Sequence, residues 1–167
     1  MNRSSIQRIS IAKLSAIFTK FFNNPNISLE VIKTEILSIP DETIRKYGAY
    51  GYTLIKILKN DPQRKITYSE LAEETNRVYH IGFPQKGNAL SKMSANATAL
   101  VSTSSFVTQN FFITSVVISK KKRIPSDGFK SLIEILTNTT LNNREYQMKI
   151  SEEQSKTTKF FTNIQNS

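Results

Sequence analysis

The chain contains no cysteine and one histidine, His80, among its 167 residues. Without cysteine it has no disulfide framework, no thiol nucleophile and no cysteine-bearing zinc site. One histidine is too few for a two-histidine metal centre or a paired-histidine catalytic site. Glycine is also scarce, with five residues and no glycine-rich phosphate loop. We therefore expect a protein that is not an enzyme and that needs neither a cofactor nor a metal.

Long hydrophobic runs are missing as well. No stretch approaches the roughly 18 consecutive apolar residues of a membrane-spanning helix. The first residues lead into an amphipathic segment rather than the apolar core of a secretory signal. These features predict a cytoplasmic protein with no membrane partner.

Negative charge is in short supply, because 13 acidic residues face 23 lysines and arginines, which gives a formal net charge of +10. A protein that neutralises phosphates releases condensed counterions and gains affinity without special geometry. Nucleic acid is therefore the expected partner, and the alternatives that the charge leaves open are an acidic protein and an anionic membrane surface.

The apolar residues are numerous enough for one folded core, since 38% of the chain is hydrophobic and it includes 10 Phe and 6 Tyr. Apolar spacings of three to five residues predict a helix over 5–22, and shorter patterns predict helices over 28–40 and 41–58. Gly48 and Gly51 lower the helix propensity of the third by about 1 kcal/mol each, which predicts a close helix contact or a break. Residues 1–61 are thus expected to form a helical N-terminal subdomain.

Residues 62–136 show a different order of elements. Thr67-x-x-Glu70 is a capping box that opens a helix over 69–75, and a second helix is suggested over 88–93. The β-branched and aromatic run over 111–119 predicts a strand. Two helices followed by a strand and the basic run Lys120–Arg123 are the order of a winged helix-turn-helix with a short β-hairpin. Residues 137–167 are expected to form a helical or partly disordered tail. The expected fold class is α+β and mostly helical.

Three short motifs in this region resemble the winged-helix DNA-binding domain of the alkyltransferases and alkyltransferase-like proteins. They are Arg64-Lys65-Ile66-Thr67-Tyr68-Ser69-Glu70-Leu71-Ala72, Gly87-Asn88-Ala89-Leu90 and Ser115-Val116-Val117, and the resemblance covers residues 62–125. It implies that Tyr68 packs on a DNA phosphate and that Gly87–Leu90 lie on a recognition helix that enters the minor groove.

The chain departs from that family at the motif that carries the family's reactive cysteine. Its Pro-Cys-His-Arg motif falls on Phe112–Ser115, so Ile113 stands where the alkyl-accepting cysteine would be, which excludes alkyl transfer. The arginine that wedges into the base stack would fall on Pro84, and this change argues against nucleotide flipping as that family performs it.

The candidate site residues are basic or polar and lie in three groups: before the first helix of the helix-turn-helix and at its start, on or near the recognition helix, and in the basic wing. They are Arg64, Lys65, Tyr68, Lys86, Asn88, Ser91, Lys92, Lys120, Lys121, Lys122 and Arg123. Their partner groups would be phosphates and base edges. Ala89, Leu90 and Met93 are expected to face the core.

The leading hypothesis is a non-enzymatic protein that binds duplex DNA. The alternative is a phage or mobile-element interaction protein that binds and inhibits a host factor through a winged-helix scaffold, and RNA is a third possible partner. The sequence leaves the target sequence and the oligomeric state open.

Overall fold

The computed structural model describes residues 2–167 and begins with three helices. They are α1 (Arg3–Asn23), α2 (Leu29–Leu37) and α3 (Glu42–Asn60). Asn2 caps α1 by accepting a hydrogen bond from the Ser5 amide, and Asp41 caps α3 by accepting from the Ile44 amide. The three helices expected in residues 1–61 are confirmed.

Helix α3 continues unbroken through Gly48 and Gly51 because both glycines meet neighbouring side chains. A Cβ atom at Gly51 would lie 2.5 Å from Cζ of Phe18 and 3.2 Å from Cβ of Val101. One at Gly48 would lie 2.9 Å from Cγ2 of Ile36. The glycines therefore mark close helix contacts rather than a break in the helix.

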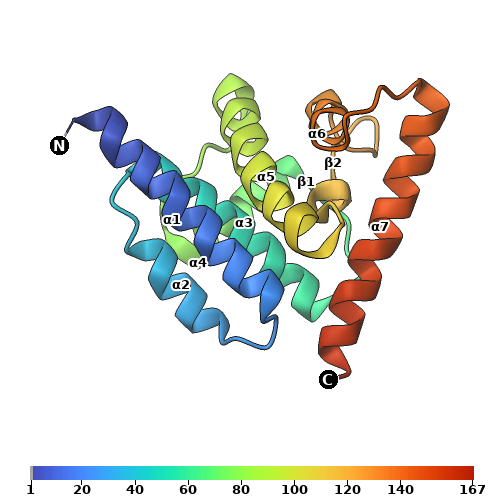
Figure 1. Ribbon diagram of the computed structural model, residues 1–167. Coiled ribbons are helices and arrows are strands. Elements are labelled where there is room, and N and C mark those ends of the chain that lie inside the picture. Colours follow the sequence, from blue (N-terminus) through green and yellow to red (C-terminus); the bar gives the residue numbers. More distant parts are fainter. Residues whose placement is uncertain (1) are drawn as a thin grey trace.

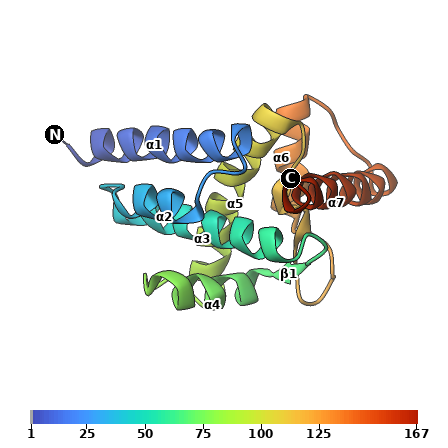
Figure 2. The same ribbon diagram turned by 90° about the horizontal axis from the view of Figure 1, so that it is seen from below.

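The central region opens with a two-residue strand, β1 (Ile66–Thr67), which leads directly into α4 (Tyr68–Tyr79). Both hydrogen bonds of the Thr67–Glu70 capping box are present, as expected. Helix α5 (Gly87–Gln109) then runs across α1, α3 and α4, which Figure 2 shows one above another. The predicted second helix is thus confirmed, and it is much longer than 88–93.

The serines and threonines of α5 do not interrupt it, and many of their hydroxyls donate to carbonyls one turn back within the helix. Thr98, Thr103 and Thr108 bond in this way to the carbonyls of Ser94, Ala99 and Ser104. Polar composition alone therefore understates how far the helix continues.

The first turns of α5 project beyond the neighbouring helices (Figure 1). Leu90 and Met93 pack against the main core, as expected, whereas Ala89 is exposed and was wrongly placed inside. Ala89 is exposed because it lies on this projecting turn, where little of the molecule packs beside the helix.

The strand predicted over 111–119 is mostly wrong. Residues Ile113–Val116 form a 3-10 turn, η1, and only Val117–Ile118 form a strand, β2. Strand β2 pairs in parallel with β1, with Val117 opposite Ile66 and Ile118 opposite Thr67. Residues 111–118 are all buried, so their β-branched and aromatic composition reflects burial among helices.

The expected β-hairpin is also wrong. The only sheet within residues 2–167 is this parallel pair, whose strands are separated in sequence by two helices. A hairpin needs antiparallel neighbours. The basic run Lys120–Arg123 is accordingly a turn that connects β2 to α6 (Asp127–Thr137), not the tip of a two-stranded wing.

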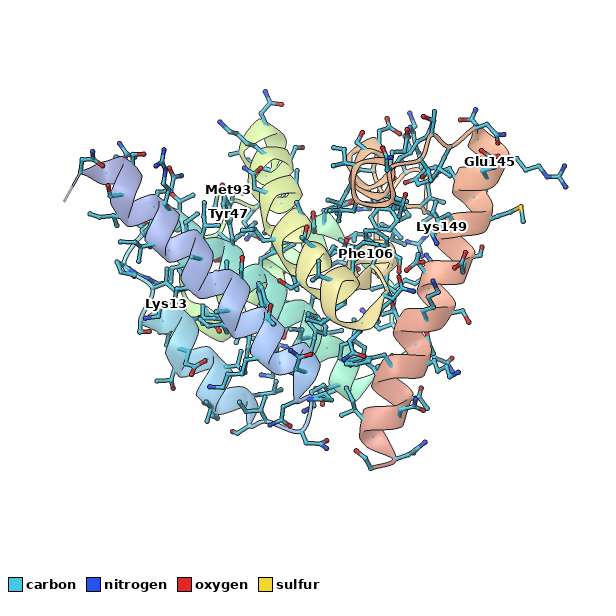
Figure 3. The ribbon with its side chains drawn as sticks, in the orientation of Figure 1. Lys13, Tyr47, Met93, Phe106, Glu145 and Lys149 are labelled. Atoms are coloured by element: carbon cyan, nitrogen blue, oxygen red, sulfur yellow. The ribbon has the colours of Figure 1, made fainter. Side chains whose placement is uncertain are left out.

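The tail is helical, which was one of its two expected forms. It forms one continuous helix, α7 (Asn143–Gln165), opened by a second capping box between Asn142 and Glu145. Phe161 packs into the main core, while Tyr146 and Ile150 join a smaller core with Phe112, Phe129 and Ile133. Phe106, labelled in Figure 3 on the side of α5 that faces α6 and α7, stacks on Phe112 with ring centroids 4.6 Å apart.

Segment 111–116 lies between α5 and α7, and side chains of these two helices bind its backbone. Glu153 of α7, only 1% exposed, accepts the Phe112 amide at 2.8 Å and pairs with Lys149 and Lys156 at 3.0 Å each. From α5, Ser105 accepts the Ile113 amide at 3.1 Å. Because buried backbone groups need partners, these bonds fix a segment that has little regular structure of its own.

Removing the Glu153 carboxylate tests this anchoring. Glu153→Ala leaves the Phe112 amide without its partner and two lysines without their shared anion, so unfolding should be easier by about 3–5 kcal/mol. Urea denaturation measures the change. The control is Glu152→Ala, whose side chain is 51% exposed and pairs with the same lysines, and which should cost less than about 1 kcal/mol. Equal losses in the two variants would contradict the anchoring role.

Candidate nucleic-acid interface

The connection between α4 and α5, residues 80–86, holds the start of α5 in a fixed position. The Asn76 side chain donates to the Phe83 carbonyl at 2.8 Å and accepts the Phe83 amide at 2.6 Å. The Phe83 ring stacks on Tyr50 with centroids 4.6 Å apart. His80 is exposed and ends α4 in a left-handed conformation, with φ of 51°.

The start of α5 presents polar and basic groups to solvent. Lys86 is its N-cap residue and makes no side-chain cap bond, and the first turn carries no acidic residue. Asn88, Ser91 and Lys92 are exposed, as expected for these candidates. The helix therefore offers unpaired amide groups, two lysines and two small polar side chains on one projecting end.

The basic turn, residues 120–123, is closed by Ser119. The Ser119 amide donates to the Ile124 carbonyl at 2.8 Å, and the Ser119 carbonyl accepts the Arg123 amide at 2.9 Å. The Ser119 hydroxyl accepts the Lys122 amide at 2.9 Å. All four basic side chains are exposed on this closed loop.

Glu70 feels the charge of two basic segments that are distant from each other in sequence. Its carboxylate accepts from the amide and the hydroxyl of Thr67, at 2.9 and 2.7 Å. These bonds, and then the charges of Arg64 and Arg123, lower the pKa of Glu70 below its ordinary value. Because Ile118 of β2 pairs with Thr67, the residue before α4, the basic turn begins near the start of α4.

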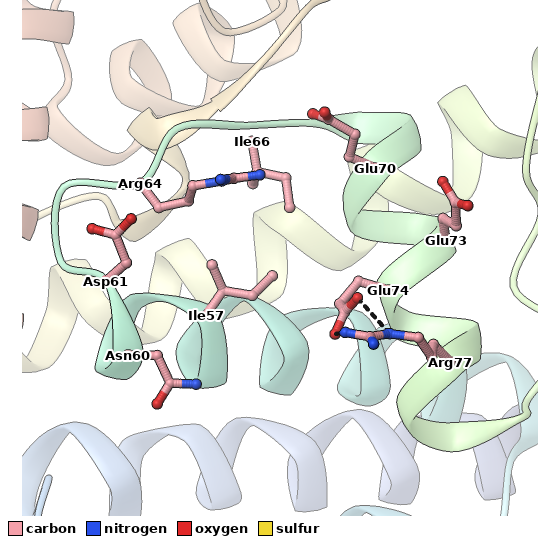
Figure 4. A pocket seen from close by; sticks show the side chains of 9 residues that line it. All are labelled: Ile57, Asn60, Asp61, Arg64, Ile66, Glu70, Glu73, Glu74 and Arg77. Carbon is pink, nitrogen blue, oxygen red and sulfur yellow. Dashed lines mark hydrogen bonds and ion pairs between the residues drawn. The ribbon is translucent and has the colours of Figure 1, made fainter.

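Arg64 lies among carboxylates, so its position is less favourable for binding an anion than the sequence suggests. It lines a hollow of about 430 Å³ between α3 and α4, together with Asp61, Glu70, Glu73 and Glu74. Figure 4 shows the Arg64 side chain lying along this hollow. The surrounding carboxylates offset its charge, so this arginine and its exposed neighbour Lys65 lie at the less cationic margin of the candidate surface.

Tyr68, the first residue of α4, is half-buried, and its hydroxyl is engaged within the chain. It donates to the Ser126 hydroxyl at 3.2 Å and accepts the Ser126 amide at 3.1 Å. Tyr68, Ser91, Ser126 and Gly128 line one cavity of about 250 Å³. The structure thus brings α4, α5 and the start of α6 together at this point.

Ser126 and Gly128 belong to this surface but were not among the candidates. The Pro-Ser-Asp-Gly sequence predicts a turn and a helix cap. Ser126 does occupy the N-cap position of α6, which begins at Asp127, but its side chain makes no cap bond. Only the fold brings it beside Tyr68 and α5, since no periodicity links residues so far apart. Its position directly after the basic run was the one signal in the sequence.

A second and stronger signal in the sequence concerns the charge of the whole candidate surface. Residues 75–126 contain no aspartate or glutamate at all, although they include α5 and the basic turn. Within residues 2–167, none of the candidate lysines and arginines forms an ion pair; those pairs involve Lys20, Lys46, Arg77, Lys130, Lys149 and Lys156. Among the described residues, no ion pair therefore neutralises the lysines of α5 and of the basic turn.

Ile113, at the position of the family's reactive cysteine, is completely buried in the main core. Residues 2–167 contain no group of three or more histidine, aspartate or glutamate side chains that could hold a metal ion. Over the same residues, no helix has the length and apolar content needed to cross a membrane.

Comparisons with protein families, curated proteins and solved structures found no match to this chain.

The pKa of the Glu70 carboxyl tests whether Arg123 lies near it. A carboxyl whose pKa is lowered in the folded state contributes stability above its ordinary pKa and loses it as pH falls through the lowered value. The Glu70 carboxyl should therefore titrate below the ordinary glutamate range in a ¹³C NMR pH series. Arg123→Gln should raise its midpoint, and Lys121→Gln, in the same turn, should raise it less. An unchanged midpoint in Arg123→Gln would show that the turn does not reach Glu70.

Proposed function

We propose that this protein binds duplex DNA without catalysing a reaction, through a surface formed by the start of α5 and the basic turn. The observation that carries the proposal is the absence of acidic residues over 75–126, together with the absence of ion pairs at the candidate cations within residues 2–167. A cationic surface of this kind attracts phosphates because binding releases their counterions.

The start of α5 suits a phosphate backbone in a second way. Its amide groups carry no side-chain cap, and the helix dipole places partial positive charge at the same end. Lys86 and Lys92 add full charges there. These groups would position the protein on DNA without reading its sequence.

Asn88 and Ser91 are neutral polar groups on this surface that can read bases. Both are exposed on the projecting turns of α5, and both can donate and accept hydrogen bonds. Because the helix is anchored through Phe83 and Asn76, these side chains approach a groove as one rigid unit. The resemblance to the alkyltransferase-like winged helix favours duplex DNA over RNA for the same segment.

Salt dependence tests the proposal. The logarithm of duplex affinity should fall linearly with the logarithm of salt concentration, as measured by fluorescence anisotropy with a short labelled duplex. Changing Lys121 and Lys122 to Ser should weaken binding and flatten the slope by up to about 0.9 for each phosphate that the protein no longer neutralises.

A matched variant separates a local surface from net charge. Lys56 and Lys159 lie on the C-terminal halves of α3 and α7, and neither forms an ion pair within residues 2–167. Changing both to Ser removes the same charge and should leave the slope nearly as in the unmodified protein. Equal effects of the two double variants, or no duplex binding at low salt, would refute the proposal.

A further inference from the structure

The Tyr68 hydroxyl has no proton left for a phosphate. A tyrosine hydroxyl donates one hydrogen bond, and that of Tyr68 goes to the Ser126 hydroxyl at 3.2 Å. Its oxygen accepts the Ser126 amide at 3.1 Å. A phosphate oxygen needs a donor, so Tyr68 would have to break its bond to Ser126 in order to contact one.

The Ser126 hydroxyl is in the opposite situation. It accepts from Tyr68, but its own proton has no acceptor within residues 2–167, and the side chain does not cap α6. Ser126 is exposed, so the free donor faces solvent. The tyrosine bond orients this donor without consuming it.

The surroundings of Ser126 place that donor on the proposed DNA surface. Ser126 follows the basic turn by three residues and lines the same cavity as Ser91 of α5. The Ser126 carbonyl accepts the hydroxyl of Tyr146 at 3.1 Å and the amide of Phe129 at 3.0 Å, so the backbone is held on its inner side. The hydroxyl therefore lies in a fixed position between α5 and the basic turn.

We propose that Ser126 donates a hydrogen bond to a DNA phosphate and that Tyr68 is a positioning residue that orients the Ser126 hydroxyl. The inference rests on the proposed DNA binding. It assigns a contact to a residue outside the candidate set and gives Tyr68 a different role from the direct phosphate contact that the family resemblance implies.

Substitutions at Ser126 test the contact. Ser126→Ala should weaken binding of a short labelled duplex by about tenfold, the effect of one hydrogen bond to a charged group. Because the removed donor is neutral, the salt slope should stay unchanged, unlike that of the basic-turn variant. Ser126→Thr, which keeps the hydroxyl, should restore most of the affinity.

The matched control is Ser131→Ala, one turn further along α6, where the exposed hydroxyl donates to the Asp127 carbonyl. It should bind DNA as the unmodified protein does. Thermal unfolding of each variant shows whether a weaker affinity comes from a less stable fold.

A double-mutant cycle tests the role of Tyr68. Tyr68→Phe should weaken binding, and the double variant with Ser126→Ala should bind no more weakly than Ser126→Ala alone, since both changes remove the same contact. Independent effects of the two changes, or normal binding by Ser126→Ala, would overturn the inference. If Ser126→Ala bound normally while the variant with Lys121 and Lys122 changed to Ser still flattened the salt slope, the Ser126 inference would fail and the proposed DNA binding would stand. If the unmodified protein bound no duplex, both proposals would fail.

Discussion

The buried carboxylate of Glu153 is the interaction on which the arrangement of the C-terminal half depends. It holds the Phe112 amide and two lysines at once. A buried charge is costly unless it is paired and hydrogen-bonded, and here both conditions are met. The bonded segment continues into β2, which then pairs with β1. The position of the basic turn beside α4 therefore follows from an ion cluster on α7.

The proposed surface combines parts that are fixed independently of one another. Phe83 and Asn76 fix the start of α5, Ser119 closes the basic turn, and Tyr68 connects α4 to the start of α6. Together these bonds hold basic side chains that form no ion pair within residues 2–167. A surface of this kind repels itself electrostatically, and the helical core beneath it supplies the stability that offsets the repulsion.

Local patterns predicted the local features well. Asp41, Thr67 and Glu70 are recognisable as capping residues because the bonds they make span three positions. The strand over 111–119 failed because β-branched and aromatic residues suit any crowded interior, and here the neighbours are helices and hydroxyl groups. The hairpin failed with it, since parallel pairing across α4 and α5 leaves no local trace.

The candidate surface likewise contains residues that the sequence indicated and residues that only the fold brings together. The cations of α5 and the basic turn were visible as charge, and the missing acidic residues over 75–126 reinforce them. For Ser126 the sequence offered only its position after the basic run, because its proposed role depends on a hydroxyl pair that joins residues 58 positions apart. The carboxylates around Arg64 were likewise hidden, since Asp61 and the three glutamates meet only when α4 packs against α3.

Chemical-shift mapping of the ¹⁵N-labelled protein during titration with a short DNA duplex at low salt tests the central claim most directly. The account predicts that the largest changes fall on the amides of residues 86–92 and 119–126, with little change over 156–167 of α7. Changes centred on another face, or a spectrum that the duplex leaves unaltered, would contradict it.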